Sequence, residues 1–472
     1  MVIRHEELYI PQGKDSKPFL NCKLGRDKYA KILTSIVGTY NDGFVLAINN
    51  RWGSGKTTFV KMWQQQLMNE NFTTLYFNAW ENDFQEDVII ALLAELKEIV
   101  GKGEELFKTV LSKALPLIKQ AVPEIIKHTV EKRLGESTAD LLNGIGKYSV
   151  KELEDSLKEY NNKKKGITEF RNILEQYVAT IDSNKPVIFI IDELDRCRPN
   201  YSVEVLEQIK HLFSVKGIVF VLSIDKEQLE NAVKGFYGSE SINSEEYLRR
   251  FIDVEYSIPE PDKNAFCDYL FKYFGFSHFF NLPVRKNNND FKGEEDTFKA
   301  ISKIIFSNNH VILRQIEKIY GHTAIVLNTF EQHENIFPVS LLFLIHCKIN
   351  HIVFYQNLSR GSLSLQQLVV KIEEIIPLGS SRSGNRYQSY LMSNMLCLYD
   401  NFLKTNKDTL GILSYMEDTG EPKLNVSLNK YQSLNKNIIL SVQAFFQKFK
   451  YNHESIDKLI NKINLSDSFV IN

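Results

Sequence analysis

The residues best suited to chemistry begin with a glycine-bearing stretch at residues 50–58, which has the sequence NRWGSGKTT. An apolar run at residues 44–48 precedes this stretch, and a helix-like segment at residues 59–67 follows it. In a strand–loop–helix setting, backbone N–H groups can ring a phosphate. Lys56 would reach the β- and γ-phosphates of a nucleotide, and the Thr57 hydroxyl would ligate Mg²⁺. The pattern therefore predicts a phosphate-binding loop, or P-loop.

The first position of this loop departs from the consensus, because Asn50 stands where the consensus has glycine. Asparagine tolerates left-handed backbone better than most residues, so we expect the loop to form despite the change. The residues that we expect to contact the nucleotide all lie in this loop, and they are Trp52, Gly53, Ser54, Gly55, Lys56, Thr57 and Thr58.

A pair of carboxylates, Asp192 and Glu193, follows a continuous apolar run at residues 186–191. A carboxylate at the end of a buried strand can hold Mg²⁺ beside the phosphates, directly or through water, and we expect this role of Asp192. Glu193 could act as general base or orient the attacking water. The alternative is that both residues begin a turn and pair with Arg196. The P-loop upstream favours the first interpretation, a Walker B motif.

Two neighbouring pairs of polar residues each have two interpretations. Asp195 and Arg196 could form a local pair that shapes the site, or they could face a neighbouring subunit. Ser223 and Asp225 end the next predicted strand, where a polar sensor of the γ-phosphate could stand. Asp225 could equally cap the helix that begins at Lys226.

The elements that must position these motifs alternate between strands and helices. Apolar, β-branched runs predict strands at residues 44–48, 73–78, 186–191, 217–223 and 254–258. Helical spacing of apolar residues predicts helices at residues 26–36, 59–67, 88–100, 203–213 and 226–236. This alternation is typical of an α/β fold with a doubly wound parallel sheet of five strands.

The predicted core is divided in the sequence. Residues 1–100 form its first half, and residues 167–260, with the Walker B motif, form its second half. Between them, residues 101–166 mix charged and apolar residues at helical spacing, which predicts an exposed helical insertion. The rest of the chain is predominantly helical in pattern, and we predict a helical lid at residues 261–378 and a C-terminal helical domain at residues 379–472.

The composition indicates an ordinary soluble protein in a reducing compartment. Hydrophobic residues make up 43% and charged residues 24% of the 472 residues, and the net charge of −1 gives no sign of a polyanionic partner. The five cysteines include no Cys-x-x-Cys pair, which argues against a disulfide framework or a zinc site. We expect Cys197 to be a buried thiol rather than a reactive one. Because no signal-like segment or apolar run of membrane-spanning length occurs, we expect a cytoplasmic protein without a membrane span.

Four motifs in order resemble the KAP family of P-loop NTPases. They are WGSGKT at residues 52–57, YFNAW at 76–80, IIDELDRC at 190–197 and YLRRFIDVEYSIP at 247–259. The resemblance covers roughly residues 24–330. It implies an ATPase of the additional-strand class that takes ATP and Mg²⁺, with Lys56 on the phosphates, Thr57 and Asp192 on Mg²⁺, and Glu193 as the catalytic acid.

The resemblance also implies roles for three arginines. Arg249 and Arg250 stand where related ATPases carry an arginine finger, a cation offered to the γ-phosphate of an adjacent subunit. Arg314 stands in a segment similar to the helical lid, where an arginine contacts phosphate. The alternatives are a surface pair at a helix end for Arg249 and Arg250, and an ordinary exposed residue for Arg314.

The function that these features predict is ATP hydrolysis coupled to homo-oligomerisation or to remodelling of a protein partner held by the helical C-terminal half. Two departures from the family are Asn50 and the charged insertion, which stands where many members carry transmembrane helices. Bacterial members include phage-exclusion proteins, which implies a role in antiphage defence. The alternatives are a signalling or scaffold module with little turnover, a nucleic-acid-stimulated ATPase with residues 163–165 as contact, and, more remotely, a small-acceptor kinase.

Overall fold

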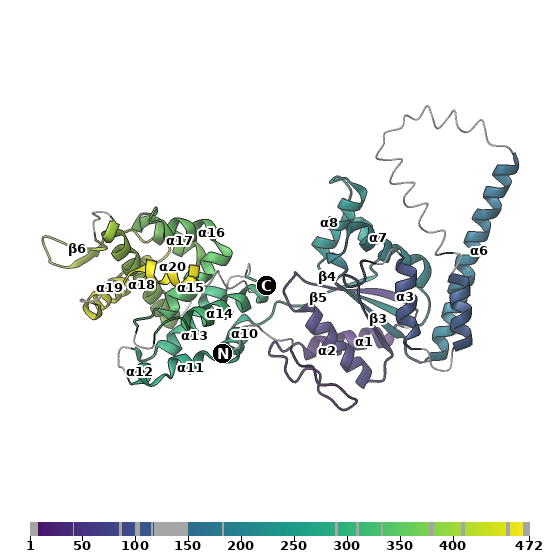
Figure 1. Cartoon of the computed structure of the whole chain (residues 1–472), viewed down its shortest axis with the longest axis horizontal. Coiled ribbons are helices and arrows are strands. Elements are labelled where there is room, and N and C mark those ends of the chain that lie inside the picture. The colour runs from purple at the N-terminus through teal and green to yellow at the C-terminus, as the bar shows by residue number, and fades with distance from the viewer. Residues whose placement is uncertain are drawn as a thin grey trace. The chain divides into compact units, whose positions relative to one another are not determined.

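The computed structural model is drawn in Figure 1. It describes residues 8–40, 42–84, 87–99, 104–114, 117, 150–181, 184–287, 291–307, 311–331, 334–376, 382–406, 411–449 and 454–465. These residues form two compact units, one of Leu8–Glu260 and one that contains Pro261–Asn472. The P-loop and the Walker B motif both lie in the first unit, called here the N-terminal unit. The second is called the C-terminal unit.

A five-stranded parallel sheet is the centre of the N-terminal unit. Its order is β2-β3-β4-β1-β5, with β1 at Phe44–Asn49, β2 at Thr74–Asn78, β3 at Val187–Asp192, β4 at Ile218–Ile224 and β5 at Val254–Ser257. Strand β4 pairs with both β1 and β3, so one strand separates the P-loop strand from the Walker B strand. This arrangement confirms the predicted α/β fold and the additional-strand class of its sheet.

Helices cover both faces of this sheet because its inner strands are apolar on both sides. On one face, Ile48 and Ile190 pack with residues of α1 (Asp27–Thr39) and α2 (Lys56–Asn69). On the other face, strand residues such as Phe189 and Phe220 pack with α3, α6, α7 and α8. Figure 1 shows α1 and α2 on one side of the strands and α7 and α8 on the other. The bounds on the second face are Val88–Lys97 for α3, Val150–Ile181 for α6, Pro199–Gln208 for α7 and Lys226–Tyr237 for α8.

Among the differences between observed and predicted helix boundaries, those of α2, α7 and α6 have a local explanation. Helix α2 begins at Lys56, where Gly55 is left-handed, rather than at residue 59. Helix α7 begins at Pro199, because proline suits the first helical turn, and a π-helical turn, Ile209–Phe213, replaces the predicted end of a regular helix. Helix α6 runs past residue 166, where we predicted the insertion to end. A single glycine inside a helix costs only about 1 kcal/mol.

The predicted insertion is described only in part. Residues 104–114 are helical, and α6 begins at Val150. The intervening residues, apart from residue 117, lie outside the described residues up to residue 149. The predicted helical character of residues 101–166 is therefore seen at its two ends.

The C-terminal unit is built mainly of helices. In its core Phe276 stacks on Phe298, and Tyr320 packs edge-on against both rings. A two-stranded antiparallel hairpin of β6 (Leu413–Tyr415) and β7 (Pro422–Leu424) was not predicted, because three-residue strands give almost no periodic signal. Helix α18 contacts α13 and α15, so helices from both sides of the proposed boundary at residues 378–379 pack together. The helices are α10 (Lys263–Tyr273), α11 (Phe276–Phe280), α12 (Pro283–Lys286), α13 (Glu294–Phe306), α14 (Leu313–Leu327), α15 (Pro338–Asn350), α16 (Ile352–Ser359), α17 (Leu365–Ile375), α18 (Arg382–Asn406), α19 (Asn435–Lys448) and α20 (Ile456–Leu465).

Among the described residues, no helix combines the length and the apolar character that crossing a bilayer requires. All five cysteines lie in the described part of the chain and all are free thiols. Cys197 is buried, and burial raises the pKa of its thiol well above the usual range, which agrees with the expectation of an unreactive side chain.

Candidate functional site

The P-loop connects β1 to α2 and takes its shape from two glycines. Gly53 and Gly55 have φ values of 73° and 83°, a left-handed conformation that favours glycine. Among the described non-glycine residues, positive φ occurs at Asn71 and Glu193, so Asn50 does not need the left-handed tolerance that we expected it to use. Its side chain instead braces the loop, with Nδ2 donating to the Ile258 carbonyl at 3.0 Å.

Lys56 is buried at the start of α2, and its ammonium folds back into the loop. Nζ donates to the carbonyls of Asn50 at 2.6 Å and of Arg51 at 3.3 Å. Burial lowers the pKa of Lys56, an effect that the nearby carboxylates of Asp195, Asp225 and Asp192 oppose. The cation is therefore held over the loop with three acidic groups within electrostatic reach.

The remaining loop residues present polar groups around this lysine. Thr57 and Thr58 lie half-buried in the first turn of α2. The Ser54 hydroxyl is buried and, within the described structure, has no hydrogen-bond partner. A buried polar group without a hydrogen-bond partner is unfavourable. A polar ligand bound in the loop would supply the partner that the Ser54 hydroxyl lacks.

Arg26 contacts the backbone of the loop and was not predicted as a site residue. It is 3% exposed, and its guanidinium donates to the carbonyls of Ser54 at 2.8 Å and of Gly55 at 3.1 Å. In a trans peptide the C=O and N–H groups point in opposite directions. The N–H groups of Gly55 and Lys56, which share peptide units with these carbonyls, therefore point away from Arg26. In the sequence Arg26 merely precedes an ordinary amphipathic helix, and no local pattern marks it as a site residue. Its role is seen only in its contacts with the P-loop, which lies 28 and 29 residues later in the chain.

Asp192 is the last residue of β3, and the residues in register with it on the two neighbouring strands are also polar. It is 1% exposed and accepts hydrogen bonds from the Tyr76 hydroxyl and from the Glu193 backbone, both at 2.9 Å. In the sheet register it lies between Asn78 of β2 and Ser223 of β4. The buried Ser223 hydroxyl has no partner among the described residues. These side chains form a polar row on the sheet face that α2 covers.

Glu193 has a left-handed backbone, with φ at 61°, which is uncommon for a residue other than glycine. Its carboxylate pairs with Arg196 at 2.8 Å. Burial raises the pKa of Glu193, while Arg196 opposes that effect. Of our two interpretations of Asp195 and Arg196, the local pair is not formed between those two residues, because Arg196 bonds Glu193 instead.

Asp195 takes part in a closed set of hydrogen bonds with Trp52 and Asp225, which we call the Trp52 clasp. Oδ2 of Asp195 accepts from the Trp52 indole Nε1 and, at 3.1 Å, from the Asp225 backbone N–H. Asp225 accepts from the Trp52 backbone N–H at 3.0 Å. The Asp225 side chain makes no cap bond to α8, so the helix-cap interpretation of this side chain is wrong. Burial raises the pKa of Asp195, and the Lys56 ammonium opposes the effect.

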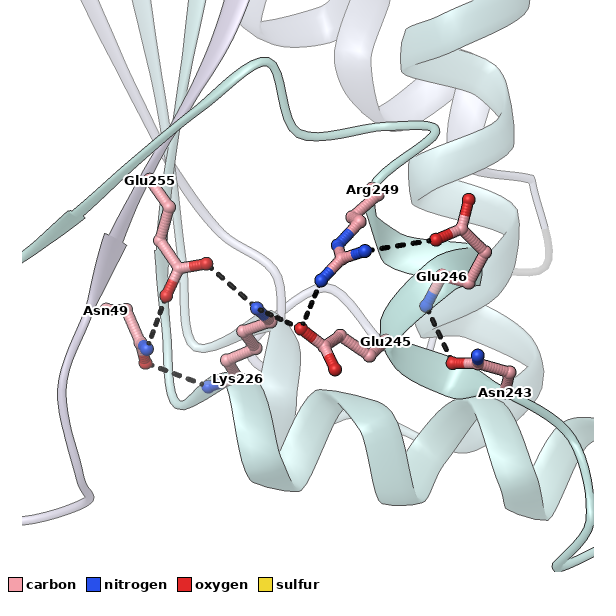
Figure 2. A network of polar contacts seen from close by, with 7 residues as sticks. All are labelled: Asn49, Lys226, Asn243, Glu245, Glu246, Arg249 and Glu255. Carbon is pink, nitrogen blue, oxygen red and sulfur yellow. Dashed lines mark hydrogen bonds and ion pairs between the residues drawn. The ribbon is translucent and has the colours of Figure 1, made fainter.

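Figure 2 shows a second network, which links the end of β1 to α9 (Ser244–Leu248). Asn49 accepts from the Lys226 backbone at 3.1 Å and donates to Glu255 at 2.9 Å. The Lys226 ammonium pairs with Glu255 at 2.9 Å and lies 3.9 Å from Glu245. Glu245 in turn pairs with Arg249 at 2.8 Å. The strand that leads into the P-loop is thus joined to α9 by a chain of polar contacts.

The three arginines of the predicted site lie at exposed positions. The Arg249 side chain is 63% exposed and also pairs with Glu246 at 3.2 Å, on its own helix (Figure 2). Arg250 is exposed beside it. Arg314 lies on the exposed side of α14 in the C-terminal unit. The structure therefore brings the P-loop, Asp192 and Glu193 together, and it places Arg249 and Arg250 at the end of α9 on the surface of the same unit.

Three known proteins are similar to this chain at low sequence identity. A relative from Methanocaldococcus jannaschii, an uncharacterized protein, is 28% identical over 175 residues, which are 32% of this chain and 90% of that protein. The ORC2 protein of Aeropyrum pernix, solved in ADPNP–ADP complexes, is 16% identical with a TM-score of 0.34, over 93% of this chain and 97% of that one. AMPPCP-bound DnaA from Aquifex aeolicus is 12% identical with a TM-score of 0.24, over 75% and 98%.

A family model gives the assignment. The model of the KAP family P-loop domain matches residues 26–307, which is more than half of the chain. The match begins at Arg26, includes the P-loop and the Walker B motif, and extends past β5. The chain belongs to the KAP family of P-loop NTPases.

Proposed function

We propose that this chain binds ATP with Mg²⁺ and hydrolyses it. The observation that supports this most directly is the meeting of a buried lysine with a strand-end carboxylate. Lys56 lies within the P-loop, and Asp192 is close enough to affect its pKa. P-loop NTPases place these two groups on the phosphates and on the metal ion.

The residues present fit such a ligand. The Lys56 ammonium and the N–H groups of residues 53–58 would hold the phosphates, while the Thr57 hydroxyl and Asp192 would hold Mg²⁺. Two buried hydroxyls without partners among the described residues, those of Ser54 and Ser223, offer further polar groups. When bound, Mg²⁺ neutralises charge on the phosphate oxygens.

Glu193 is the residue that we propose for proton transfer. Its backbone conformation and its ion pair with Arg196 fix its carboxylate directly after the Walker B strand. The burial that raises the pKa of Glu193 strengthens it as a base. It would orient the attacking water and accept its proton.

Arg249 and Arg250 are proposed to act on the γ-phosphate of a neighbouring subunit in a homo-oligomer. Arg249 is engaged by Glu245 and Glu246. The Arg250 side chain has no hydrogen bond or ion pair among the described residues, which makes it the freer cation of the two. We further propose that residues 261–378 act as a lid, with Arg314 as its phosphate contact, and that residues 379–472 bind a protein partner.

One experiment tests both catalysis and assembly. ATP hydrolysis should fall about 100-fold or more in Glu193→Gln, the range expected when a positioned general base is lost. The matched control is Glu227→Gln, an exposed glutamate of α8, which should keep the wild-type rate. Light scattering with and without an ATP analogue, run beside the assay, reports on oligomers. Equal rates in Glu193→Gln and wild type would remove Glu193 from the mechanism.

The alternative of a signalling or scaffold module gives a different result in the same experiment. Such a module would change its assembly state with the analogue while turning ATP over very slowly in the wild type. Nucleic-acid stimulation has less support, since Lys165 lies on α6 and pairs with Glu169 one turn away, as is typical of a solvated helix face. A role in antiphage defence rests on the family resemblance alone.

A further inference from the structure

The Trp52 clasp joins the P-loop, the turn after β3 and the start of α8, which are far apart in the sequence. We propose that Asp195 is a positioning residue of the nucleotide site, which holds the P-loop in its phosphate-binding shape by fastening Trp52 to the start of α8. This inference rests on the proposed function, because it assumes that the P-loop binds a nucleotide.

The geometry of the clasp makes one oxygen its centre. Oδ2 of Asp195 accepts both the indole N–H of Trp52 and the backbone N–H of Asp225. The Asp225 carboxylate returns to the backbone N–H of Trp52. Each of the three residues therefore bonds both of the others, and Trp52 is held through its backbone and its side chain at once.

The P-loop needs such support because its glycines leave the backbone free. Gly53 and Gly55 follow Trp52 directly or within three positions, and glycine loses more conformational freedom on ordering than any other residue. Arg26 fixes the second half of the loop through the carbonyls of Ser54 and Gly55. The clasp fixes the first half. A loop held on both flanks avoids part of the entropic cost of binding.

Burial gives these contacts their strength. Asp195 and Asp225 are each 6% exposed, and hydrogen bonds in a region of low dielectric constant are electrostatically stronger than those in water. Lys56 compensates the carboxylate charge. Asp195 could therefore affect the site in two ways, through its hydrogen bonds to Trp52 or through its charge on Lys56, and the test must separate them.

The test compares the affinity of full-chain variants for a non-hydrolysable ATP analogue with Mg²⁺, measured by calorimetry beside thermal unfolding. Asp195→Ala removes the acceptor, and Trp52→Phe removes only the indole donor. Each should weaken binding about tenfold, the size expected for one charge-assisted hydrogen bond. Asp195→Asn keeps an amide oxygen for both bonds while losing the charge, so it should bind within about threefold of wild type.

The affinity of the double variant that combines Asp195→Ala with Trp52→Phe decides whether the two residues act through one contact. Because Asp195→Ala and Trp52→Phe break the same contact, the double variant should bind no more weakly than the weaker single one. Trp80→Phe, an exposed tryptophan in the loop after β2, is the matched control and should bind like wild type.

Three results would overturn the proposal. They are additive losses in the double variant, wild-type affinity in Trp52→Phe, and an Asp195→Asn variant as weak as Asp195→Ala, which would assign the effect to charge. If Asp195→Ala does not fold, Trp52→Phe and Asp195→Asn still decide the question. A wild-type chain that does not bind the analogue would refute the proposed function instead, so the two failures are distinguishable.

Discussion

The polar contacts around the P-loop and those around α9 differ in what they join. Arg26 and Asp195 are buried and bond backbone or side chains from distant segments. Arg249 is exposed and pairs with Glu245 and Glu246, four and three residues earlier in the chain. A buried polar group that loses its partner costs far more than an exposed ion pair contributes. The difference indicates a P-loop that is preformed and, at the end of α9, an arginine that can exchange partners.

The largest effect is expected among the buried contacts of the P-loop, where Lys56→Ala should weaken nucleotide binding. Loss of the ammonium removes the main cation of the loop, so affinity for the ATP analogue should fall about 100-fold or more. Lys61→Ala on the same helix is the control, because Lys61 is half-buried and faces Tyr76 rather than the loop. Calorimetry of both variants gives the comparison. Unchanged affinity in Lys56→Ala would defeat the P-loop assignment.

Arg26→Ala tests how much the buried contacts of Arg26 with the P-loop contribute to the stability of the fold. The carbonyls of Ser54 and Gly55 would lose their charged donor, and the free energy of unfolding should drop by about 3 kcal/mol. Urea unfolding measures this change. The control is Arg171→Ala, an exposed arginine that also bonds a carbonyl, that of Ser214, and it should cost less than about 1 kcal/mol. Equal losses in the two variants would erase the contrast between buried and exposed contacts.

Glu204 of α7 shows what burial does to a carboxylate whose charged neighbours are acidic. Burial first, and then Asp87 and Glu207, raises the pKa of Glu204 from 4.5 to about 7. Because the folded state binds the proton more tightly than the unfolded state, this group stabilises the fold at low pH. That stability is lost as the pH rises from about 4.5 to 7.

The prediction for Glu204→Gln follows from this sign. The variant should be more stable than wild type by about 1 kcal/mol at pH 8, an amount reduced for the partial exposure of the group, and its stability should depend less on pH. Unfolding in urea at pH 5 and pH 8 measures both. A wild-type stability that rises between these values, with no difference in Glu204→Gln, would contradict the assignment.

Much of the fold could be predicted from the sequence because the signals are local. Apolar runs marked all five strands of the sheet, and the glycines and Lys56 marked the turn into α2. The P-loop and the Walker B motif could be assigned to one site because strands and helices alternate along the chain, as in a parallel sheet. Short elements such as β6 and β7 gave no such signal.

The contacts that shape the candidate site could not be predicted in this way. Arg26 and the P-loop carbonyls are 28 and 29 residues apart, and Trp52 is 143 residues from Asp195 and 173 from Asp225. No periodic pattern connects such positions, since the fold alone brings them together. The same limit explains why neither of the two interpretations of Asp195, a local pair with Arg196 or a contact with a neighbouring subunit, included Trp52.

The smallest effect is expected on the exposed side, in Arg249→Ala. Its ion pairs lie at helical i,i+3 and i,i+4 spacing on the surface, so the free energy of unfolding should hardly change. Lys226→Ala should cost more, because Lys226 is half-buried and its ammonium pairs with Glu255 and approaches Glu245 (Figure 2). Urea unfolding at low and high salt measures both variants, and screening should further reduce the effect of Arg249. A loss in Arg249→Ala as large as that in Arg26→Ala would show that α9 is fixed in the same way as the P-loop, and the arginines would then have no freedom to serve a neighbouring subunit.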